Sequence, residues 1–356
     1  WRRTVSVPTH TLPMFTPIQL TGCDAVAPTR FIRSATALSL SKDGLPSIEL
    51  ADRYIELAKG RVGIIMGGHV NVTEQGLANP LQAGMHSDTV IEAHRAVLSK
   101  VKAECPHVLV FAQLAHAGMM GHAMKMMMQK GADPASVPEG VCCTPLTMDS
   151  PKEELDELPA AFAAAAVRAI ECGYDGVQIH SGHGYLLASS LSPTMNTRTD
   201  EYKAGPELLY RVIRAVKDAV PDRYPVACKM NCTDNTPAGE WMGRKYAAGT
   251  TPQMGAASAA KIAPMLCLLE LTGGLAGYPT CVDGTARKGV KRQGFYYAEA
   301  AKLVREAVGK DLVLAGTGGF RTMEHIDSAT VDGPLDMVAP SRPFLRTPTW
   351  LCDLED

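Results

Sequence analysis

The sequence predicts one α/β domain of the (β/α)8 class, the TIM barrel. Eight short apolar segments alternate with helical segments along the 356 residues, and no Pro-, Ser- or Gly-rich linker divides them. Small or polar residues follow most of the apolar segments, at the strand ends where barrels of this class carry their functional groups. A doubly wound sheet is the alternative, but the chain lacks the G-x-G-x-x-G turn that such a sheet carries after its first strand.

The predicted strands and helices follow from local patterns. Residues 48–59, IELADRYIELAK, have apolar side chains at helical spacing. Residues 158–172 are rich in alanine, and Gly173 suits the position just after a helix. In chain order the strands are residues 31–34, 62–66, 108–114, 176–180, 226–230, 266–271, 312–315 and 335–339, and the helices are residues 48–59, 90–103, 158–172, 207–220, 252–263, 296–308 and 322–329.

Composition argues against several classes of protein. The formal net charge of −2 provides no electrostatic footprint for nucleic acid or for an anionic membrane. No apolar run approaches the roughly 20 residues of a membrane span. The ten cysteines contain no C-x-x-C pair, which argues against a zinc ribbon and against an iron–sulfur cluster. We therefore expect an intracellular protein in a reducing compartment, with the cytoplasm as the first choice.

The beginning of the chain leaves a second compartment open. The sequence starts at Trp1, and residues 1–22 contain two arginines and several Thr and Ser but no acidic residue. Organelle-targeting segments have this composition, so the mitochondrial matrix is the alternative, although an ordinary basic N-terminus fits equally well. Within a single domain spanning residues 1–356, we expect residues 1–13 to be an N-terminal extension and the Met-rich residues 119–150 to be an insertion after the third strand.

The densest group of reactive side chains lies at residues 174–202, YDGVQIHSGHGYLLASSLSPTMNTRTDEY. A buried strand ends at His180, and His183 and Tyr185 follow among glycines that allow the chain to curl. Both imidazoles and the phenol can then face one pocket. Zinc binding by the histidines is an alternative, but H-x-x-H after a strand lacks the helical spacing of a zinc pair, and no convincing third ligand is nearby. Purely structural histidines and a packing role for Tyr185 remain alternatives.

This segment resembles the signature of the Old Yellow Enzyme family, the FMN-dependent ene-reductases and NADH:flavin oxidoreductases. Members of that family have a strand that ends in His, then His or Asn before Gly-Tyr, and then a Leu-Ser-Pro…Asn-x-Arg-x-Asp-Glu-Tyr segment. The resemblance covers residues 14–348 and implies the same single barrel. The matching residues here are His180, His183, Gly184, Tyr185, Leu191, Ser192, Pro193, Asn196, Arg198, Asp200, Glu201 and Tyr202.

The resemblance implies FMN as the cofactor and places its ring at the strand ends. Gln113, in the segment FAQLAHAG, would hold the pyrimidine edge. Lys229, in the apolar run PVACKM, would be the cation beside N1 and O2 of the flavin, although a buried lysine often simply pairs with a carboxylate. Small residues after the first two strands would let the backbone approach the ring, and these are Ser34, Ala35, Thr36, Ala37 and Gly68.

The phosphate of FMN is expected at the loops after the seventh and eighth strands, the recurrent phosphate site of such barrels. Gly318 and Gly319 precede a predicted helix, so their N–H groups can point at an anion, although a Gly-Gly pair can also be just a turn. Ser341 and Arg342 follow the eighth strand in the segment SRPF, which is close to the family's form.

The implied reaction is an NAD(P)H-dependent oxidoreduction of a small molecule. The nicotinamide reduces the flavin, which then passes a hydride to the β-carbon of an electron-poor alkene. His180 and His183 would bind the substrate oxygen and stabilise its developing charge, and Tyr185 would donate the proton. His69 and His116 could either line the pocket or cap strand ends. Ala37 departs from the family pattern, which bears on the flavin potential.

A non-enzymatic alternative belongs to a different class of function. The Met-rich loop, the atypical start and the short C-terminal end also suit a barrel, with or without flavin, that serves as an accessory or structural subunit of a larger assembly. The expected partners are therefore a small-molecule substrate and, beyond it, either a homo-oligomer or a larger protein assembly, with no nucleic acid.

Overall fold

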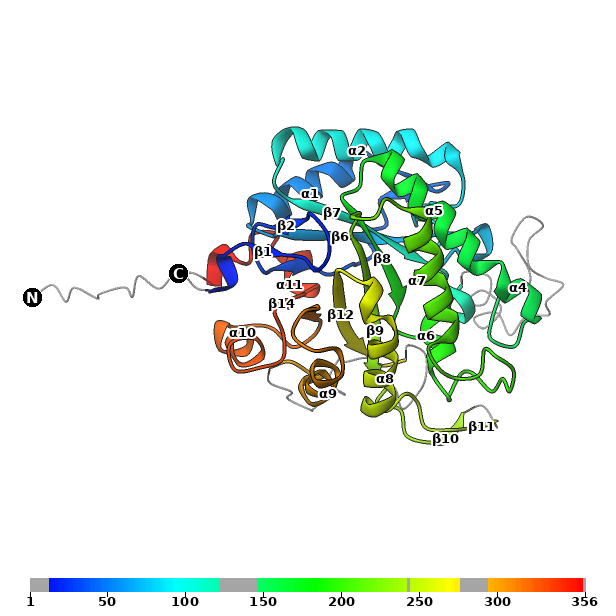
Figure 1. Ribbon diagram of the computed structural model, residues 1–356. Coiled ribbons are helices and arrows are strands. Elements are labelled where there is room, and N and C mark those ends of the chain that lie inside the picture. Colours follow the sequence, from blue (N-terminus) through cyan, green and yellow to red (C-terminus); the bar gives the residue numbers. More distant parts are fainter. Residues whose placement is uncertain (1–12, 122–145, 242–243, 276–293, 355–356) are drawn as a thin grey trace, which may run out of the picture.

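The computed structural model describes residues 13–121, 146–241, 244–275 and 294–354 (Figure 1). Eight parallel strands form one sheet in the order β14-β13-β12-β9-β8-β7-β6-β3. A bridge between Phe31 and Val338 brings the two edges together, so the sheet closes into a barrel. The predicted fold class is confirmed. The strands are β3 Ile32–Arg33, β6 Ile64–Asn71, β7 Leu109–Ala115, β8 Gly176–Ser181, β9 Val226–Thr233, β12 Leu268–Gly273, β13 Val313–Gly316 and β14 Met337–Val338.

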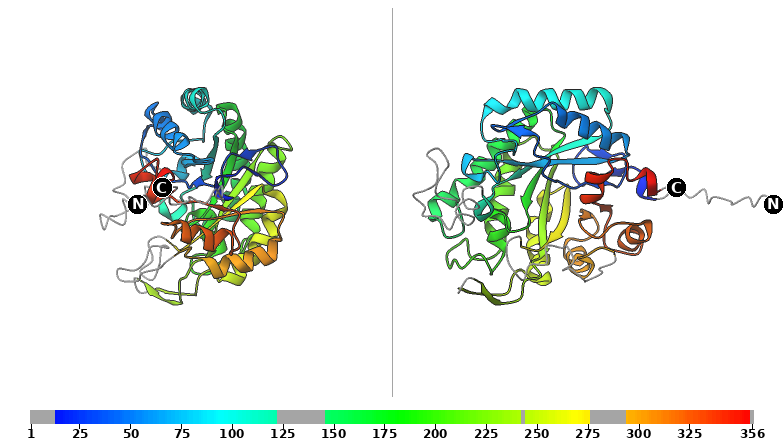
Figure 2. Two further views of the ribbon diagram at one scale, coloured as in Figure 1. Left: turned by 90° about the vertical axis from the view of Figure 1, so that its left-hand side faces the viewer. Right: turned by 180° about the vertical axis from the view of Figure 1, so that it is seen from behind.

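Helices surround the barrel on its outside (Figures 1 and 2). Each predicted helix is present, because each has one apolar face to bury; along α7, for example, residues 208, 209, 212, 213 and 216 are buried. Gly173 adopts φ +94° after α5, as its predicted capping role requires. These helices are α1 Glu49–Lys59, α2 Ile91–Glu104, α5 Leu158–Cys172, α7 Glu207–Ala219, α8 Pro252–Ile262, α9 Ala298–Val308 and α10 Met323–Thr330.

Several short elements were not predicted, since two- to six-residue segments carry too little periodicity to be recognised. The hairpin of β1 and β2 lies at the N-terminal ends of the barrel strands. The added elements are β1 Ile18–Gln19, β2 Val26–Ala27, β4 Ser41–Lys42, β5 Leu45–Pro46, β10 Gly239–Trp241, β11 Arg244–Tyr246, α4 Lys152–Asp156, α6 Leu186–Leu191, α11 Arg342–Arg346 and the 3-10 turns Pro13–Phe15, Glu74–Gly76, Asp88–Val90, Gly118–Met120, Ala263–Met265 and Cys352–Leu354. The predicted extension at 1–13 and insertion at 119–150 fall largely outside the described residues.

The end of the second strand differs from the prediction. Gly68 was expected after the strand, but β6 continues to Asn71. Its pairing with β7 shifts between Met66 and His69. Gly68 therefore lies at a bulge inside the strand, where the pairing is interrupted and then resumes.

The barrel interior has an apolar layer near the N-terminal ends of the strands. Phe111 is part of this layer, and a Cβ on Gly176 would lie 2.7 Å from its ring, so glycine makes room for it. Leu20 and Ala27 of the β1–β2 hairpin pack onto the same cluster. The strands contribute Ile32, Ile64, Met66, Phe111, Ala227, Leu268, Val313, Ala315 and Met337. Farther toward the C-terminal ends of β7, β8, β9 and β12, the buried side chains include the polar residues Gln113, Gln178, Lys229 and Glu270.

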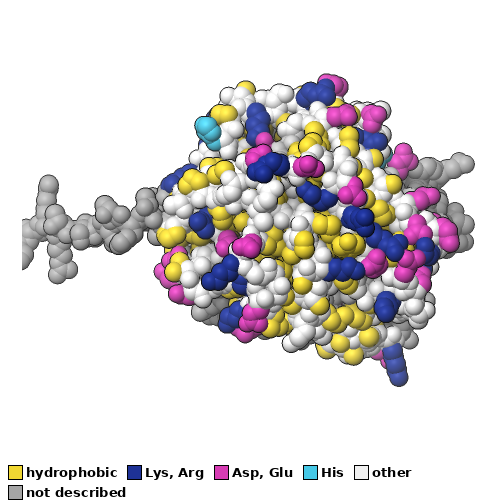
Figure 3. Space-filling view, viewed as in Figure 1, with side chains coloured by type: hydrophobic (Ala, Val, Ile, Leu, Met, Phe, Trp, Pro, Cys, Tyr) yellow, Lys and Arg dark blue, Asp and Glu magenta, His cyan; other side chains and the backbone are white. Residues whose placement is uncertain are grey.

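The outer surface offers no field of a single charge sign on the face shown in Figure 3, where basic and acidic side chains are interspersed. This pattern agrees with the small net charge. Among the described residues, no helix combines the length and the apolar character needed to cross a membrane.

Candidate active site

A buried ion pair forms the floor at the C-terminal end of the barrel. Lys229 of β9 and Glu270 of β12 are direct partners in the strand register. Lys229 Nζ lies 2.9 Å from Glu270 Oε1, and the two side chains are 3% and 0% exposed. The Ser34 hydroxyl accepts from Lys229 Nζ at 2.6 Å and donates to Glu270 Oε1 at 2.6 Å. Glu270 is thus the anionic partner that a buried lysine requires.

Amide side chains extend this floor across the barrel. Gln113 and Gln178 are register partners on β7 and β8. Gln113 Nε2 donates to Gln178 Oε1 at 2.7 Å, and Gln178 Nε2 donates to Glu270 Oε2 at 2.8 Å. The Thr317 hydroxyl also donates to Glu270. Burial acts to raise the pKa of Glu270, but the charge of Lys229 and these hydrogen bonds outweigh it, so the pKa lies below its ordinary value and Glu270 is ionised.

Sequence reasoning missed Glu270, Gln178 and Thr317. The sequence does contain a signal for Glu270, because a charged residue stands inside the apolar run LCLLELTGG. Lys229 stands in an apolar run in the same way. What the sequence alone could not show is that the two charges face each other.

A wall of aromatic rings stands next to this floor. His180 is the register partner of Lys229. Its ring centroid lies 4.8 Å from that of Tyr185 and 5.8 Å from that of His183. His183 adopts φ +60°, which curls the chain as the sequence predicted. The predicted catalytic residues are therefore brought together, and His69 joins them with its centroid 5.4 Å from Tyr185.

Two neighbouring strands hold the His183 ring and backbone in place. The His183 N–H donates to Asn231 Oδ1 at 3.1 Å, and its Nε2 lies 2.9 Å from Thr272 Oγ1. Asn231 belongs to β9 and Thr272 to β12, the same strands that provide the ion pair. His180 Nδ1 is buried without a hydrogen-bond partner among the described residues, so it remains available to a ligand.

The wall residues have strongly shifted pKa values. Burial lowers the pKa of His183 to about 3, with the positive charge of Lys229 acting in the same direction. Burial also lowers the pKa of His180 well below its ordinary value, assisted by His183 and Lys229. Burial raises the pKa of Tyr185. At neutral pH both imidazoles are therefore neutral, and the phenol keeps its proton.

The residues predicted for the flavin ring lie at one end of the barrel. Thr36 Oγ1 and Ser341 Oγ are 2.5 Å apart, which joins the loops after β3 and β14. Ala35 is half-buried, and Ala37 is exposed. Ala37 and Gly68 line a cavity of about 40 Å³ together with His69. His116, by contrast, is buried with Nδ1 accepting from the Gly118 N–H, as in a strand-end cap.

The loops after β13 and β14 suit a phosphate. Gly318 and Gly319 have φ of +109° and +98° just before α10. A Cβ on Gly319 would lie 1.8 Å from the Gly294 carbonyl oxygen, so only glycine fits there. Arg342 begins α11 with an exposed side chain, next to Ser341. Because β13 and β14 are adjacent strands, these two loops are neighbours.

These residues fit FMN. Small residues allow close approach to a flat ring, Gln113 and Lys229 supply an amide and a cation, and two glycines with an exposed arginine suit a phosphate. His180 Nδ1, which has no hydrogen-bond partner in the described part of the chain, could bind a ligand oxygen beside the flavin ring.

Two other buried histidines make stability depend on pH. Burial lowers the pKa of His94 and of His116 to about 4, whereas the unfolded value is about 6.5. The stability due to their neutral forms is complete above pH ~6.5 and is lost as the pH falls toward 4. We expect these two residues together to lower the free energy of unfolding by about 3 kcal/mol between pH ~6.5 and ~5. His180 and His183, whose pKa values are lowered in the same direction, add to this loss, and urea denaturation measures the total.

The matched variant for this prediction is His116→Asn. Its Oδ1 can replace Nδ1 as the acceptor for the Gly118 N–H, and it removes one titrating ring, so it should reduce the slope of stability against pH. A free energy of unfolding that stays constant over this pH range in the wild-type protein would contradict the interpretation.

Comparison with known proteins identifies the family of this chain. The family model described as NADH:flavin oxidoreductase / NADH oxidase matches residues 13–356. An NADH:flavin oxidoreductase of Gibberella zeae is 24% identical over 94% of this chain and 83% of the relative. An NADPH dehydrogenase of Bacillus licheniformis is 33% identical over 62% of this chain and 64% of the relative, so less than two thirds of that relative is spanned.

Two solved structures share the fold. A 2-naphthoyl-CoA reductase superposes with a TM-score of 0.79 at 20% identity, over 96% of this chain and 52% of that chain. An old yellow enzyme homologue from Zymomonas mobilis superposes with a TM-score of 0.71 at 23% identity, over 95% of this chain and 90% of that chain. The family expected from the sequence is confirmed: the chain belongs to the NADH:flavin oxidoreductase / NADH oxidase family of oxidoreductases.

Proposed function

We propose that this protein is an FMN-dependent oxidoreductase that uses NAD(P)H to reduce an electron-poor, enone-type alkene. The observation that carries the proposal is the wall of His180, His183 and Tyr185 beside the Lys229–Glu270 floor. Three potential hydrogen-bond donors in one buried place, next to a cation, suit a substrate oxygen on which negative charge develops. Membership of the family supports the cofactor.

In this proposal the chain binds FMN along the strand ends. Gln113 would hold the pyrimidine edge, and Lys229 would supply positive charge to the flavin. Gly318, Gly319 and Arg342 bind the phosphate. The small residues Ser34, Ala35, Thr36, Ala37, Gly68 and Ser341 lie against the rest of the cofactor.

Bound FMN would take a hydride from NAD(P)H and supply it to the β-carbon of the alkene. Side chains of the protein bind the substrate oxygen and donate the proton. His180 and His183, neutral because burial lowers their pKa values, donate hydrogen bonds to the substrate oxygen. Thr272 orients the His183 ring. Tyr185 stays protonated because burial raises its pKa, and it gives its proton to the α-carbon as general acid. NAD(P)H and alkene use the same pocket in turn, so turnover is ping-pong.

An absorbance spectrum of the purified protein tests the cofactor first. We expect a flavin band near ~450 nm that bleaches when NADH or NADPH is added without oxygen and returns when an enone is added. A colourless protein that also fails to take up added FMN would remove the enzyme proposal and favour the accessory-subunit alternative. If the band bleaches but no enone restores it, the reduction of the flavin by NAD(P)H is supported, and an enone-type alkene is rejected as the oxidising substrate.

A further inference from the structure

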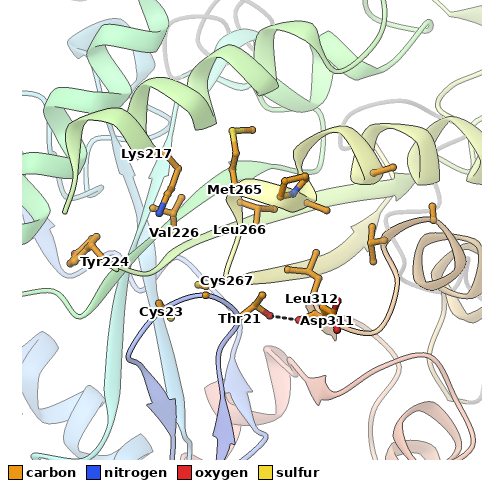
Figure 4. Close-up of a pocket in the computed structure, with 16 residues that line it drawn as sticks. Thr21, Cys23, Lys217, Tyr224, Val226, Met265, Leu266, Cys267, Asp311 and Leu312 are labelled. Atoms are coloured by element: carbon orange, nitrogen blue, oxygen red, sulfur yellow. Dashed lines mark hydrogen bonds between the residues drawn. The ribbon is translucent and has the colours of Figure 1, made fainter. Parts of the chain in front are cut away.

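A cavity lies at the end of the barrel opposite the candidate active site (Figure 4). Its volume is about 380 Å³, which is large enough for a small molecule. Its wall includes the turn between β1 and β2, the residues that precede β12 and β13, and the last turns of α7 and α9. None of these residues has a part in the proposed flavin chemistry.

Two cysteines line this cavity together, Cys23 in the hairpin turn and Cys267 directly before β12 (Figure 4). Their side chains lie next to each other in the cavity wall (Figure 4), and the Cys23 thiol donates to the Leu20 carbonyl oxygen at 3.8 Å. Thr21 holds the turn in this position, because its N–H donates to the Cys267 carbonyl oxygen at 3.1 Å and its hydroxyl donates to the Asp311 carbonyl oxygen at 2.7 Å. These bonds attach the hairpin turn to the barrel and keep the side chain of Cys23 beside that of Cys267.

The two thiols differ in acidity. The hydrogen bond from Cys267 lowers the pKa of Cys23 to about 7, whereas burial and the neighbouring Cys23 raise the pKa of Cys267. Burial likewise raises the pKa of Cys172 and Cys232, which lie elsewhere in the core. Among the charged neighbours, Asp24 acts to raise the pKa of Cys23 and Arg223 acts to lower it, whereas the Lys217 ammonium in the cavity wall acts on Cys267. An acidic thiol beside a second thiol is the arrangement of an attacking and a resolving cysteine.

We propose that Cys23 and Cys267 form a thiol–disulfide exchange site for small organic disulfides. The Cys23 thiolate attacks one sulfur of the small disulfide, so that a mixed disulfide forms and one thiolate leaves. The Cys267 thiol then loses its proton and attacks the Cys23 sulfur, which releases the second thiolate. The small disulfide gains two electrons and two protons, and the protein gains a Cys23–Cys267 disulfide that ties the hairpin to β12. This site works independently of the flavin.

The test uses the full-length reduced protein with oxidised glutathione at pH 7, followed by intact-mass and peptide mass spectrometry. We expect the protein to lose two hydrogens and to yield a peptide pair joined through Cys23 and Cys267. Cys267→Ser should stop at one glutathione on Cys23. Cys23→Ser should react about tenfold more slowly, because the thiol of lowered pKa is gone. Cys352→Ser, outside the cavity, serves as the matched control and should react like the wild type.

Other outcomes would overturn the proposal. These are glutathione attached only at Cys105 or Cys352, no linked peptide pair, or a Cys23→Ser variant that reacts as fast as the wild type. The rate in Cys267→Ser gives a second measurement that does not depend on the linked product. It should rise with pH in proportion to the ionised Cys23 thiol, and attack at an unchanged rate from pH 6 to 9 would also reject the assignment. Circular dichroism shows whether each serine variant is folded.

Discussion

Tyr185→Phe is expected to slow the reduction of the alkene about 10²- to 10⁴-fold, the range typical for loss of a general acid. The variant removes only the phenolic oxygen. The ring can keep its contacts with His69 and His180, whose centroids lie 5.4 and 4.8 Å away. The reduction of the flavin by NAD(P)H needs no proton from Tyr185, so that half-reaction should stay close to the wild-type rate.

Stopped-flow absorbance separates the two half-reactions of Tyr185→Phe. The matched control is Tyr210→Phe on α7, where the ring lies 4.8 Å from the Lys261 ammonium and outside the wall. If alkene reduction in Tyr185→Phe keeps the wild-type rate, the proton comes from another group. If both half-reactions slow equally, Tyr185 positions the site instead of donating the proton.

Glu270→Gln is expected to destabilise the protein by about 3 kcal/mol or more, because it leaves the Lys229 charge buried without its anionic partner. The same change should raise the midpoint potential of bound flavin. Glu270 offsets part of the Lys229 charge from 2.9 Å. Removing that offset would strengthen the attraction between Lys229 and a reduced, negatively charged flavin by about 3 kcal/mol. For a two-electron couple, this energy corresponds to about 60 mV.

Urea denaturation and a redox titration with reference dyes measure these two effects separately. Lys229→Met alone should be at least as destabilising, since it leaves the carboxylate unpaired. The double variant should be less destabilised than the sum of the two single variants, because neither charge remains. The exposed pair of Glu299 and Lys302 offers the control, and Glu299→Gln should change stability by less than about 1 kcal/mol. Additive single effects or an unchanged potential would contradict the role given to Glu270.

Much of the barrel could be predicted because its strands and helices are determined by local apolar patterns. The run 176–180 begins with glycine and ends with histidine, and it forms β8, which extends one residue farther to Ser181. The short hairpins could not be predicted, because a two-residue strand such as β1 exists only through its pairing with β2. The bulge at Gly68 likewise depends on how β6 pairs with β7.

By itself, the sequence determined the barrel class, the family and the segment that carries His180, His183 and Tyr185, since these follow from periodicity and from a contiguous motif. The tertiary structure alone decided which distant residues meet. Lys229 and Glu270 are 41 positions apart in the numbering, yet the register of β9 and β12 makes them partners. Cys23 and Cys267 meet because the hairpin turn is bonded to the start of β12. Such contacts arise when the sheet closes, and closure is a property of all eight strands together, which no local pattern in the sequence contains.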